Sequence, residues 1–225
     1  MKLFLSGGGA GEDSKKIDAE FIRTLDLVKP VLYIPIAIDT AKHPYLDCLD
    51  WIKNNFKSFG FENFVMWTEE DLKGKNLSDF EQFSGVYIGG GNTFKLLKEL
   101  KDFGTFEILK NLAQSGIPIY GGSAGAIIMA KTIIPALLAD ENTVGLVDFT
   151  AMNFINEADI WCHYKNIEDE KIRELINKCQ LSKVICIPET AGISVVGGVI
   201  RAIGPSDIVI FEQNRKMIFK SGDIL

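Results

Sequence analysis

Short apolar runs alternate with longer amphipathic segments along the first 130 residues, and this alternation constrains the fold more than any other feature. Each run has the length of a buried strand, and each segment between runs has the length and periodicity of a helix. The alternation predicts an α/β fold with a parallel sheet covered by helices on both faces. The expected strands are 3–5, 31–34, 64–67, 86–88 and 117–120, and the expected helices are 14–28, 46–59, one from about 93, 106–115 and one after Ser123.

The pattern changes beyond residue 131. Gly197-Gly198 and Gln213-Asn214-Arg215 separate neighbouring apolar runs at the spacing of β-hairpins, so the C-terminal strands are expected to be antiparallel. No internal repeat or linker interrupts the chain, and residues 1–225 are therefore predicted to form one domain. In this part a helix is expected at 169–179 and strands at 184–187, 193–196, 199–203, 208–211 and 216–219.

Composition excludes several classes of function. The net charge is −6 and no block of like charges occurs, whereas nucleic acids and anionic membranes require a basic surface. No apolar run has transmembrane length, and the apolar stretch near the first residue is too short for a signal peptide, so a cytoplasmic protein is expected. The four cysteines lack the spacing of metal sites or disulfides, which predicts reduced thiols and no bound metal.

Three glycine-rich segments each follow an expected strand. They are Ser6-Gly7-Gly8-Gly9, Gly89-Gly90-Gly91-Asn92-Thr93 and Gly121-Gly122-Ser123-Ala124-Gly125. Ligands of open parallel sheets bind at the carboxyl ends of the strands, so the functional site is expected where these segments meet.

Ser123 stands in a Gly-x-Ser-x-Gly pattern between an expected strand and an apolar helical run, as in the nucleophile elbow of serine hydrolases. Small neighbours permit the tight turn that exposes the hydroxyl. The N–H of Ala124, at the start of the helix, is then a natural donor to an oxyanion. The alternative is a serine that only caps the helix.

A serine nucleophile needs a general base, which is usually histidine, and the chain has only two histidines. His43 lies in a loop after the second expected strand. His163 lies at the end of a short apolar run, whose neighbours should hold the imidazole in place.

The carboxylate that would orient the base has three candidates. Glu189 follows the expected strand 184–187 and should lie near the same sheet edge as Ser123. Asp148 and Asp159 stand between Ser123 and His163, which suits a Ser–Asp–His order. The residues alone leave this choice open.

Four segments in this order resemble the peptidase E family, the serine peptidases that include aspartyl dipeptidase and cyanophycinase. The resemblance covers essentially the whole chain, and it implies a three-layer, flavodoxin-like α/β fold related to class I glutamine amidotransferases. It also implies a cofactor-independent exopeptidase, a monomer or homodimer, that cleaves small peptides through an acyl-enzyme. The segments are 89–94, 122–126, His163-Tyr164 and Pro188-Glu189.

The resemblance also assigns roles to individual residues. Ser123, His163 and Glu189 become nucleophile, base and orienting acid, which selects Glu189 among the carboxylates. The segment Ser6–Gly9 becomes a wall of the pocket. Backbone N–H groups of Ala124, Gly90 and Gly91 become the oxyanion hole, and Asn92, Thr93 and Gly122 become substrate-binding residues.

The chain departs from aspartyl dipeptidase in two places. That enzyme carries Gly-Glu-Thr-Arg-Glu after its histidine, whereas this chain has the acidic run Asn166-Ile167-Glu168-Asp169-Glu170-Lys171 without arginine. An acidic run repels an aspartyl side chain, so aspartate specificity is not expected. In addition, Trp161-Cys162 replaces the usual Asn-Pro before the histidine.

Other interpretations of the same residues remain. An α/β-hydrolase esterase would use Ser123 with His163 and either Asp148 or Asp159, but the His-Gly-Gly-Gly oxyanion motif of that class is missing. A non-catalytic module could hold a small anionic ligand in the glycine loops. A glutamine amidotransferase would need cysteine in place of Ser123.

Overall fold

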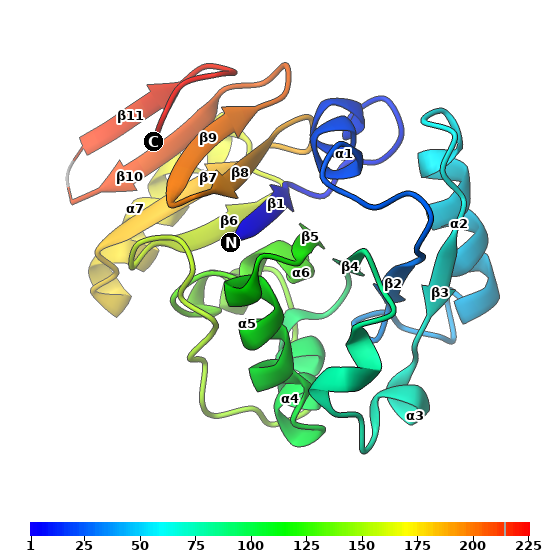
Figure 1. The fold of residues 1–225 in the computed structure, drawn as a ribbon. Helices are drawn as coiled ribbons and strands as arrows, with labels where there is room; N and C mark the ends of the chain where they lie inside the picture. Colours follow the sequence, from blue (N-terminus) through cyan, green and yellow to red (C-terminus); the bar gives the residue numbers. More distant parts are fainter. Residues whose placement is uncertain (214) are drawn as a thin grey trace.

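Two β-sheets form the frame of the protein in this computed structural model, which describes residues 1–213 and 215–225 (Figure 1). The main sheet has the strand order β3-β2-β4-β5-β1-β8-β9. Its first five strands in that order are parallel, β8 runs antiparallel beside β1, and β9 runs antiparallel beside β8. The strands are β1 Lys2–Ser6, β2 Val31–Ile34, β3 Phe64–Met66, β4 Gly85–Ile88, β5 Pro118–Gly122, β8 Gly192–Val196 and β9 Val199–Ile203.

The second sheet has the order β11-β10-β7-β6. The expected antiparallel C-terminal strands are present, but they divide between the two sheets, and β6 pairs with β7 in parallel. Apolar runs in the sequence identify strands without indicating their partners, so this division could not be predicted. Asn214 in the expected final turn lies outside the described residues. The strands are β6 Asp159–Cys162, β7 Lys183–Ile187, β10 Ile208–Glu212 and β11 Arg215–Phe219.

Most of the expected helices occur close to their predicted bounds, and α1 is the main exception. The prediction of a helix to residue 28 is wrong, because α1 ends at Ile22. Leu27 and Val28 are exposed and give a longer helix no apolar face to bury. The α-helices are α1 Lys15–Ile22, α2 Tyr45–Lys57, α3 Glu69–Leu72, α4 Thr93–Asp102, α5 Thr105–Ser115, α6 Ala124–Ile127 and α7 Asp169–Cys179, and the 3₁₀ turns are η1 Leu77–Phe80, η2 Ile134–Leu138 and η3 Asn166–Glu168.

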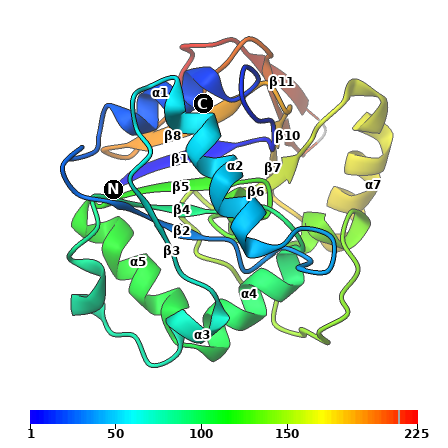
Figure 2. The ribbon, with the colours of Figure 1, turned by 90° about the vertical axis from the view of Figure 1, so that its right-hand side faces the viewer.

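The helices and sheets stack in layers. α1 and α2 cover one face of the main sheet, and α2 crosses in front of its strands in Figure 2. The other face packs against α4, α5, α6 and the second sheet, whose outer face is covered by α7. Side chains alternate between these faces along each strand: Leu3 and Leu5 of β1 belong to the aliphatic core beneath α4 and α5, whereas Phe4 belongs to the aromatic core beneath α1 and α2.

Three tyrosines stand side by side on the α1/α2 face of the main sheet. The parallel register pairs Tyr33 of β2 with Tyr87 of β4, and Tyr87 with Tyr120 of β5. The rings of Tyr33 and Tyr87 meet edge to face at 5.6 Å, and those of Tyr87 and Tyr120 stack at 4.5 Å. We call these three residues the tyrosine row.

The carboxyl ends of the central strands meet at one edge of the main sheet, and the glycine segments lie there as predicted. Their expected neighbours His163 and Glu189 come to the same edge from the second sheet, because each follows one of the paired parallel strands β6 and β7. No helix among residues 1–213 and 215–225 combines the length and the apolar character required to span a bilayer.

Candidate active site

The turn at Ser123 has the geometry of a nucleophile elbow. Ser123 joins β5 to α6 with φ +49° and ψ −110°, a conformation that costs a non-glycine residue roughly 1–3 kcal/mol. A Cβ atom on Gly121 would lie 2.4 Å from the carbonyl oxygen of Gly125. One on Gly125 would lie 2.3 Å from the carbonyl oxygen of Ile88. Glycine is therefore required at both positions because backbone occupies the space.

Helix α6 after the elbow is much shorter than the apolar run 126–130 suggested. It ends at Ile127, and the N–H groups of Ala126 and Ile127 both donate to the carbonyl oxygen of Ser123. The dipole of a long helix is therefore absent at Ser123, and only one short turn follows the serine.

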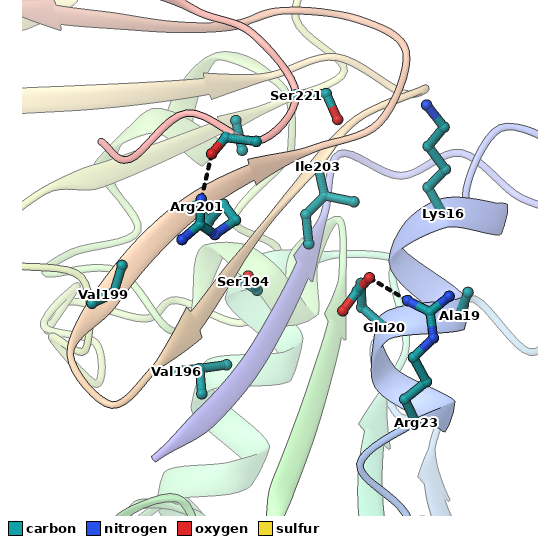
Figure 3. A pocket seen from close by; sticks show the side chains of 12 residues that line it. Lys16, Ala19, Glu20, Arg23, Ser194, Val196, Val199, Arg201, Ile203 and Ser221 are labelled. Atoms are coloured by element: carbon teal, nitrogen blue, oxygen red, sulfur yellow. Dashed lines mark hydrogen bonds and ion pairs between the residues drawn. The ribbon is translucent and has the colours of Figure 1, made fainter.

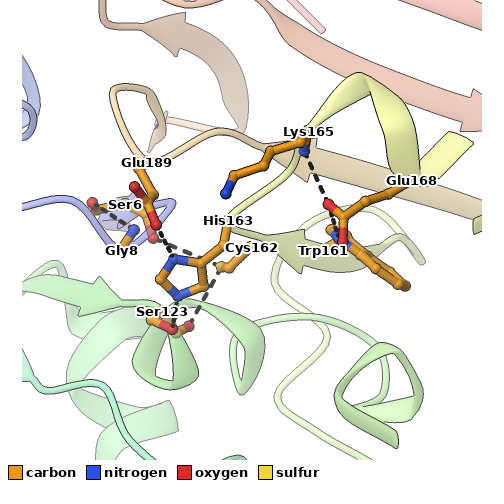
Figure 4. Close-up of polar contacts among 9 residues, drawn as sticks. All are labelled: Ser6, Gly8, Ser123, Trp161, Cys162, His163, Lys165, Glu168 and Glu189. Atoms are coloured by element: carbon orange, nitrogen blue, oxygen red, sulfur yellow. Dashed lines mark hydrogen bonds and ion pairs between the residues drawn. The ribbon is translucent and has the colours of Figure 1, made fainter. Parts of the chain in front are cut away.

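Ser123, His163 and Glu189 form one hydrogen-bonded chain (Figure 4). Ser123 Oγ lies 2.8 Å from His163 Nε2, and His163 Nδ1 lies 3.0 Å from Glu189 Oε1. This is the geometry in which an imidazole can take the serine proton while a carboxylate fixes its orientation and tautomer. The structure thus brings the three residues together from the ends of three different strands.

The first glycine segment, Ser6–Gly9, lies against His163. The backbone N–H of His163, which has φ +55°, donates to the carbonyl oxygen of Gly7 at 3.0 Å. A Cβ atom on Gly8 would lie 2.2 Å from His163 Cε1. The family resemblance implies only a pocket wall for this segment, and no local pattern in the sequence indicates that glycine is required beside the histidine.

Cys162 supports the elbow from within the core. Its Sγ lies 3.6 Å from the carbonyl oxygen of Ser123 and 3.8 Å from that of Ser6. Burial raises the pKa of the Cys162 thiol well above its ordinary value, which keeps the group protonated. Across the part of the chain that the structure describes, no cluster of three or more histidine, cysteine, aspartate or glutamate side chains is arranged to hold a metal ion.

Backbone donors surround Ser123 on the side of the second glycine segment. A Cβ atom on Gly90 would lie 3.2 Å from Ser123 Cβ, so this loop lies against the serine. The N–H groups of Gly90, Gly91 and Ala124 have no hydrogen-bond acceptor among the described residues. Free N–H groups beside a nucleophile are suited to stabilise an oxyanion.

The alternative base and acids lie elsewhere. His43 lines a cavity near Ser123 but has no hydrogen bond to it. Asp148 is exposed and forms an ion pair with Lys101 at 2.7 Å. Asp159 is buried and accepts hydrogen bonds from the N–H and Oγ1 of Thr132. A Ser–Asp–His triad of the α/β-hydrolase type is therefore not formed.

Two cavities flank Ser123 on opposite faces of the main sheet. The aromatic cavity, of about 430 Å³, lies under α2 and includes Tyr33, Trp51 and Tyr87 among its walls. The histidine-side cavity, of about 630 Å³, lies towards η2 and α7 and includes His163. Cavities of this size hold small ligands rather than folded chains.

The expected substrate-binding residues occupy different places. Gly122 lines the aromatic cavity, and Thr93 lines the histidine-side cavity with a buried Oγ1 that has no partner among the described residues. Asn92 lines neither cavity. Its side chain caps α4 by accepting from the N–H of Lys95 and donates to the carbonyl oxygen of Glu141. The side-chain amide of Asn92 thus bonds within the protein through both its oxygen and its nitrogen.

The acidic run after the histidine is divided between the cavity and the second sheet. Glu168 and Lys171 line the histidine-side cavity, whereas Asp169 pairs with Lys216. Arg173 stacks over the ring of Phe211 at 4.9 Å and does not line the cavity. Within residues 1–213 and 215–225, no arginine lines this cavity.

A further hollow lies between α1 and the strands β8 and β9, away from the serine (Figure 3). Its arginines already have partners. Arg23 pairs with Glu20, and Arg201 donates to the carbonyl oxygen of Gly222. Neither Ser123 nor His163 lines this hollow.

Comparison with known proteins shows the family of the chain. Residues 3–203 match the profile of peptidase family S51, and the chain therefore belongs to this family. Peptidase E of Pasteurella multocida (strain Pm70) is 26% identical over 152 residues, which cover 64% of this chain and 64% of the relative. The chain thus spans slightly less than two thirds of that relative's length.

Two other relatives match over more of their length. Peptidase E of Actinobacillus pleuropneumoniae serotype 5b (strain L20) is 27% identical over 202 residues, covering 86% of this chain and 82% of the relative. The crystal structure of a peptidase from an acI-B1 Actinobacterium has a TM-score of 0.71 at 17% identity and covers 100% of this chain and 96% of that one. The family and the fold inferred from the sequence are confirmed.

Proposed function

We propose that this chain is an active serine peptidase that cleaves short peptides through an acyl-enzyme on Ser123. The single observation that carries the proposal is the hydrogen-bonded chain from Ser123 Oγ through His163 to Glu189. Membership of peptidase family S51 supports the same activity.

In the first step, Ser123 Oγ attacks the carbonyl carbon of the peptide and its proton passes to His163 Nε2. Glu189 accepts a hydrogen bond from Nδ1–H and stabilises the imidazolium. The oxyanion accepts hydrogen bonds from the free N–H groups of Ala124 and the Gly90–Gly91 loop. Each such donor stabilises the transition state by about 3 kcal/mol.

In the second step, the tetrahedral intermediate expels the amine, which takes the proton from His163 Nε2. Water then attacks the ester carbonyl with His163 again as the base, and Ser123 recovers its proton as the acid product leaves. Every proton transfer in this sequence takes place at His163 Nε2, the atom that lies 2.8 Å from the serine oxygen.

The size of the two cavities supports short peptides as substrates, with one cavity for each side of the scissile bond. Aspartyl peptides are not among the proposed substrates, because no arginine or lysine lines the aromatic cavity in the described part of the chain. A cytoplasmic setting is supported by four cysteines that form no disulfide among the described residues.

Labelling with a fluorophosphonate probe tests the proposal. The wild type should be labelled on Ser123 and should hydrolyse a mixed dipeptide library, and Ser123→Ala should lose both properties. Ser182→Ala is the matched control, because Ser182 is an exposed serine whose Oγ donates only to the carbonyl oxygen of Glu157. Undiminished labelling of Ser123→Ala would refute the assignment of the nucleophile.

A further inference from the structure

The walls of the aromatic cavity include two tyrosines whose hydroxyl groups have no partner among the described residues. Tyr33 is 2% exposed and Tyr87 is 6% exposed, and both line the cavity. Neither hydroxyl forms a hydrogen bond with any residue that the structure describes, whereas Tyr120, the third member of the tyrosine row, donates to Asp18 at 2.7 Å. The two hydroxyls are therefore available to donate hydrogen bonds to a group that enters the cavity.

The remaining walls are mainly apolar. Ile38 and the buried Cys48 lie beside Trp51, whose ring meets that of Tyr87 edge to face at 6.5 Å. Trp51 is 40% exposed, which leaves the cavity open to solvent at this side chain. A volume of about 430 Å³ accommodates a large side chain.

The charges at the cavity disfavour an acidic ligand. Among the described residues, Asp47 on α2 is the only carboxylate that lines the cavity, and it forms no ion pair with any of them. No lysine or arginine in the described part of the chain lines the cavity, and His43 is the one lining side chain there that can become a cation. An aspartyl or glutamyl side chain would therefore meet the like charge of Asp47 without a permanent cation beside it.

The position of the imidazole decides which part of the substrate enters this cavity. The leaving amine must take its proton from His163, which lines the histidine-side cavity and not the aromatic one. The leaving group therefore lies on the histidine side of Ser123. The residue that becomes the acyl group then places its side chain on the opposite side, against Trp51 and the tyrosine row.

We infer that the aromatic cavity selects peptides whose residue before the scissile bond has a large apolar side chain, above all an aromatic one. This inference rests on the proposed peptidase function and names the substrate class of the same site. Tyr33 and Tyr87 donate hydrogen bonds to an acceptor at the tip of the side chain, as a phenol oxygen provides. The expected order of preference is tyrosine and phenylalanine, then leucine, then alanine, with aspartate last.

The test is a series of X-Leu dipeptides in which X is tyrosine, phenylalanine, leucine, alanine or aspartate. Burial of a phenyl side chain should raise kcat/KM by about 10- to 100-fold over that for Ala-Leu. If Ala-Leu or Asp-Leu is hydrolysed as well as Phe-Leu, the inference is refuted, and the proposed function stands because hydrolysis and labelling of Ser123 persist.

Two pairs of variants locate the preference in this cavity. Asp47→Lys should raise the kcat/KM for Asp-Leu relative to Phe-Leu, whereas Asp50→Lys makes the same charge change on an exposed position of α2 outside the cavity and should leave the ratio unchanged. Tyr33→Phe should lower the kcat/KM for Tyr-Leu but not for Phe-Leu, and Trp51→Ala should reduce the ratio of Phe-Leu to Ala-Leu. Equal effects of Asp47→Lys and Asp50→Lys would contradict the inference.

Binding to Ser123→Ala separates the two proposals. Calorimetric titration of this variant should show tighter binding of Phe-Leu than of Ala-Leu and Asp-Leu, even where no turnover is possible. If the wild type neither hydrolyses these dipeptides nor reacts with the fluorophosphonate, the proposed function fails and the binding ratio alone decides the inference. Binding without preference for Phe-Leu would overturn it.

Discussion

Asp18 is a buried carboxyl group, and its replacement by asparagine should stabilise the protein at neutral pH. It lies beneath the tyrosine row, accepts a hydrogen bond from Tyr120 at 2.7 Å and pairs with the hydroxyl of Ser14 at 2.7 Å. Burial raises the pKa of Asp18 from 3.8 to about 6, although the hydrogen bonds from Ser14 and Tyr120 oppose the shift.

The sign of the pH dependence follows from which state holds the proton. The folded protein keeps Asp18 protonated up to about pH 6, whereas the unfolded chain loses this proton near its ordinary pKa of 3.8. Between these values the folded state binds more protons, so the free energy of unfolding falls as the pH rises. The difference between a pKa of 3.8 in the unfolded chain and about 6 in the folded protein corresponds to about 3 kcal/mol of folding stability. This stability is present below pH 3.8 and is lost as the pH rises through about 6.

Asparagine has the shape of the neutral acid, carries no charge at any pH, and keeps a side-chain oxygen that can accept from the hydroxyl of Ser14 or Tyr120. The wild type should therefore lose stability between pH 4 and pH 7 that Asp18→Asn keeps. The difference in the free energy of unfolding, variant minus wild type, should increase by about 2–3 kcal/mol over this range. Urea unfolding followed by circular dichroism at several pH values measures this difference, and other titrating groups cancel. Asp50→Asn, at an exposed carboxyl, serves as the control. A pH-independent difference for Asp18→Asn would refute the reasoning.

Three further predictions concern the active site. Glu189→Gln should lower kcat by about 10²- to 10⁴-fold with little change in KM, because His163 loses the partner that fixes its tautomer. Steady-state kinetics on a dipeptide measures this, and an unchanged kcat would contradict the prediction. Gly125→Ala should lower the free energy of unfolding by about 1–3 kcal/mol, since its Cβ would meet the carbonyl oxygen of Ile88, and an unchanged urea midpoint would argue against this contact. Cys162 should remain unmodified by iodoacetamide in the folded protein at pH 8, because burial raises the pKa of its thiol; mass spectrometry detecting rapid alkylation would contradict this burial.

The elements that the sequence predicted well are those determined by local signals. The run Val31–Ile34 is continuously apolar and is a buried parallel strand, and the helix Asp169–Cys179 has a clear apolar stripe. The position of Ser123 between a strand and a helical turn could also be predicted, because the glycines on either side of it are typical of a tight turn where backbone segments lie close together.

The features that could not be predicted depend on contacts between distant segments. Asp159 and Glu189 are both carboxylates close to strands, and only the packed structure directs Asp159 to Thr132 and Glu189 to His163. The tyrosines on β2 and β4 each look like ordinary core residues in the sequence. Their alignment under Ser123 results from the register of the sheet, which no local pattern specifies.

The triad depends on how the two sheets meet, and the strand β6, which in the sequence is only a short apolar run, ends where they meet. β6 and β7 pair in parallel, with Cys162 opposite Ile187, so the chain leaves both strands at the same edge and brings His163 and Glu189 together. The N–H of His163 then bonds to the carbonyl oxygen of Gly7 at the end of β1, which fixes this edge against the main sheet. The hydrogen-bonded chain of Ser123, His163 and Glu189 is formed here because parallel strands of two sheets end at one place, and because glycine leaves room there for a serine turn and an imidazole.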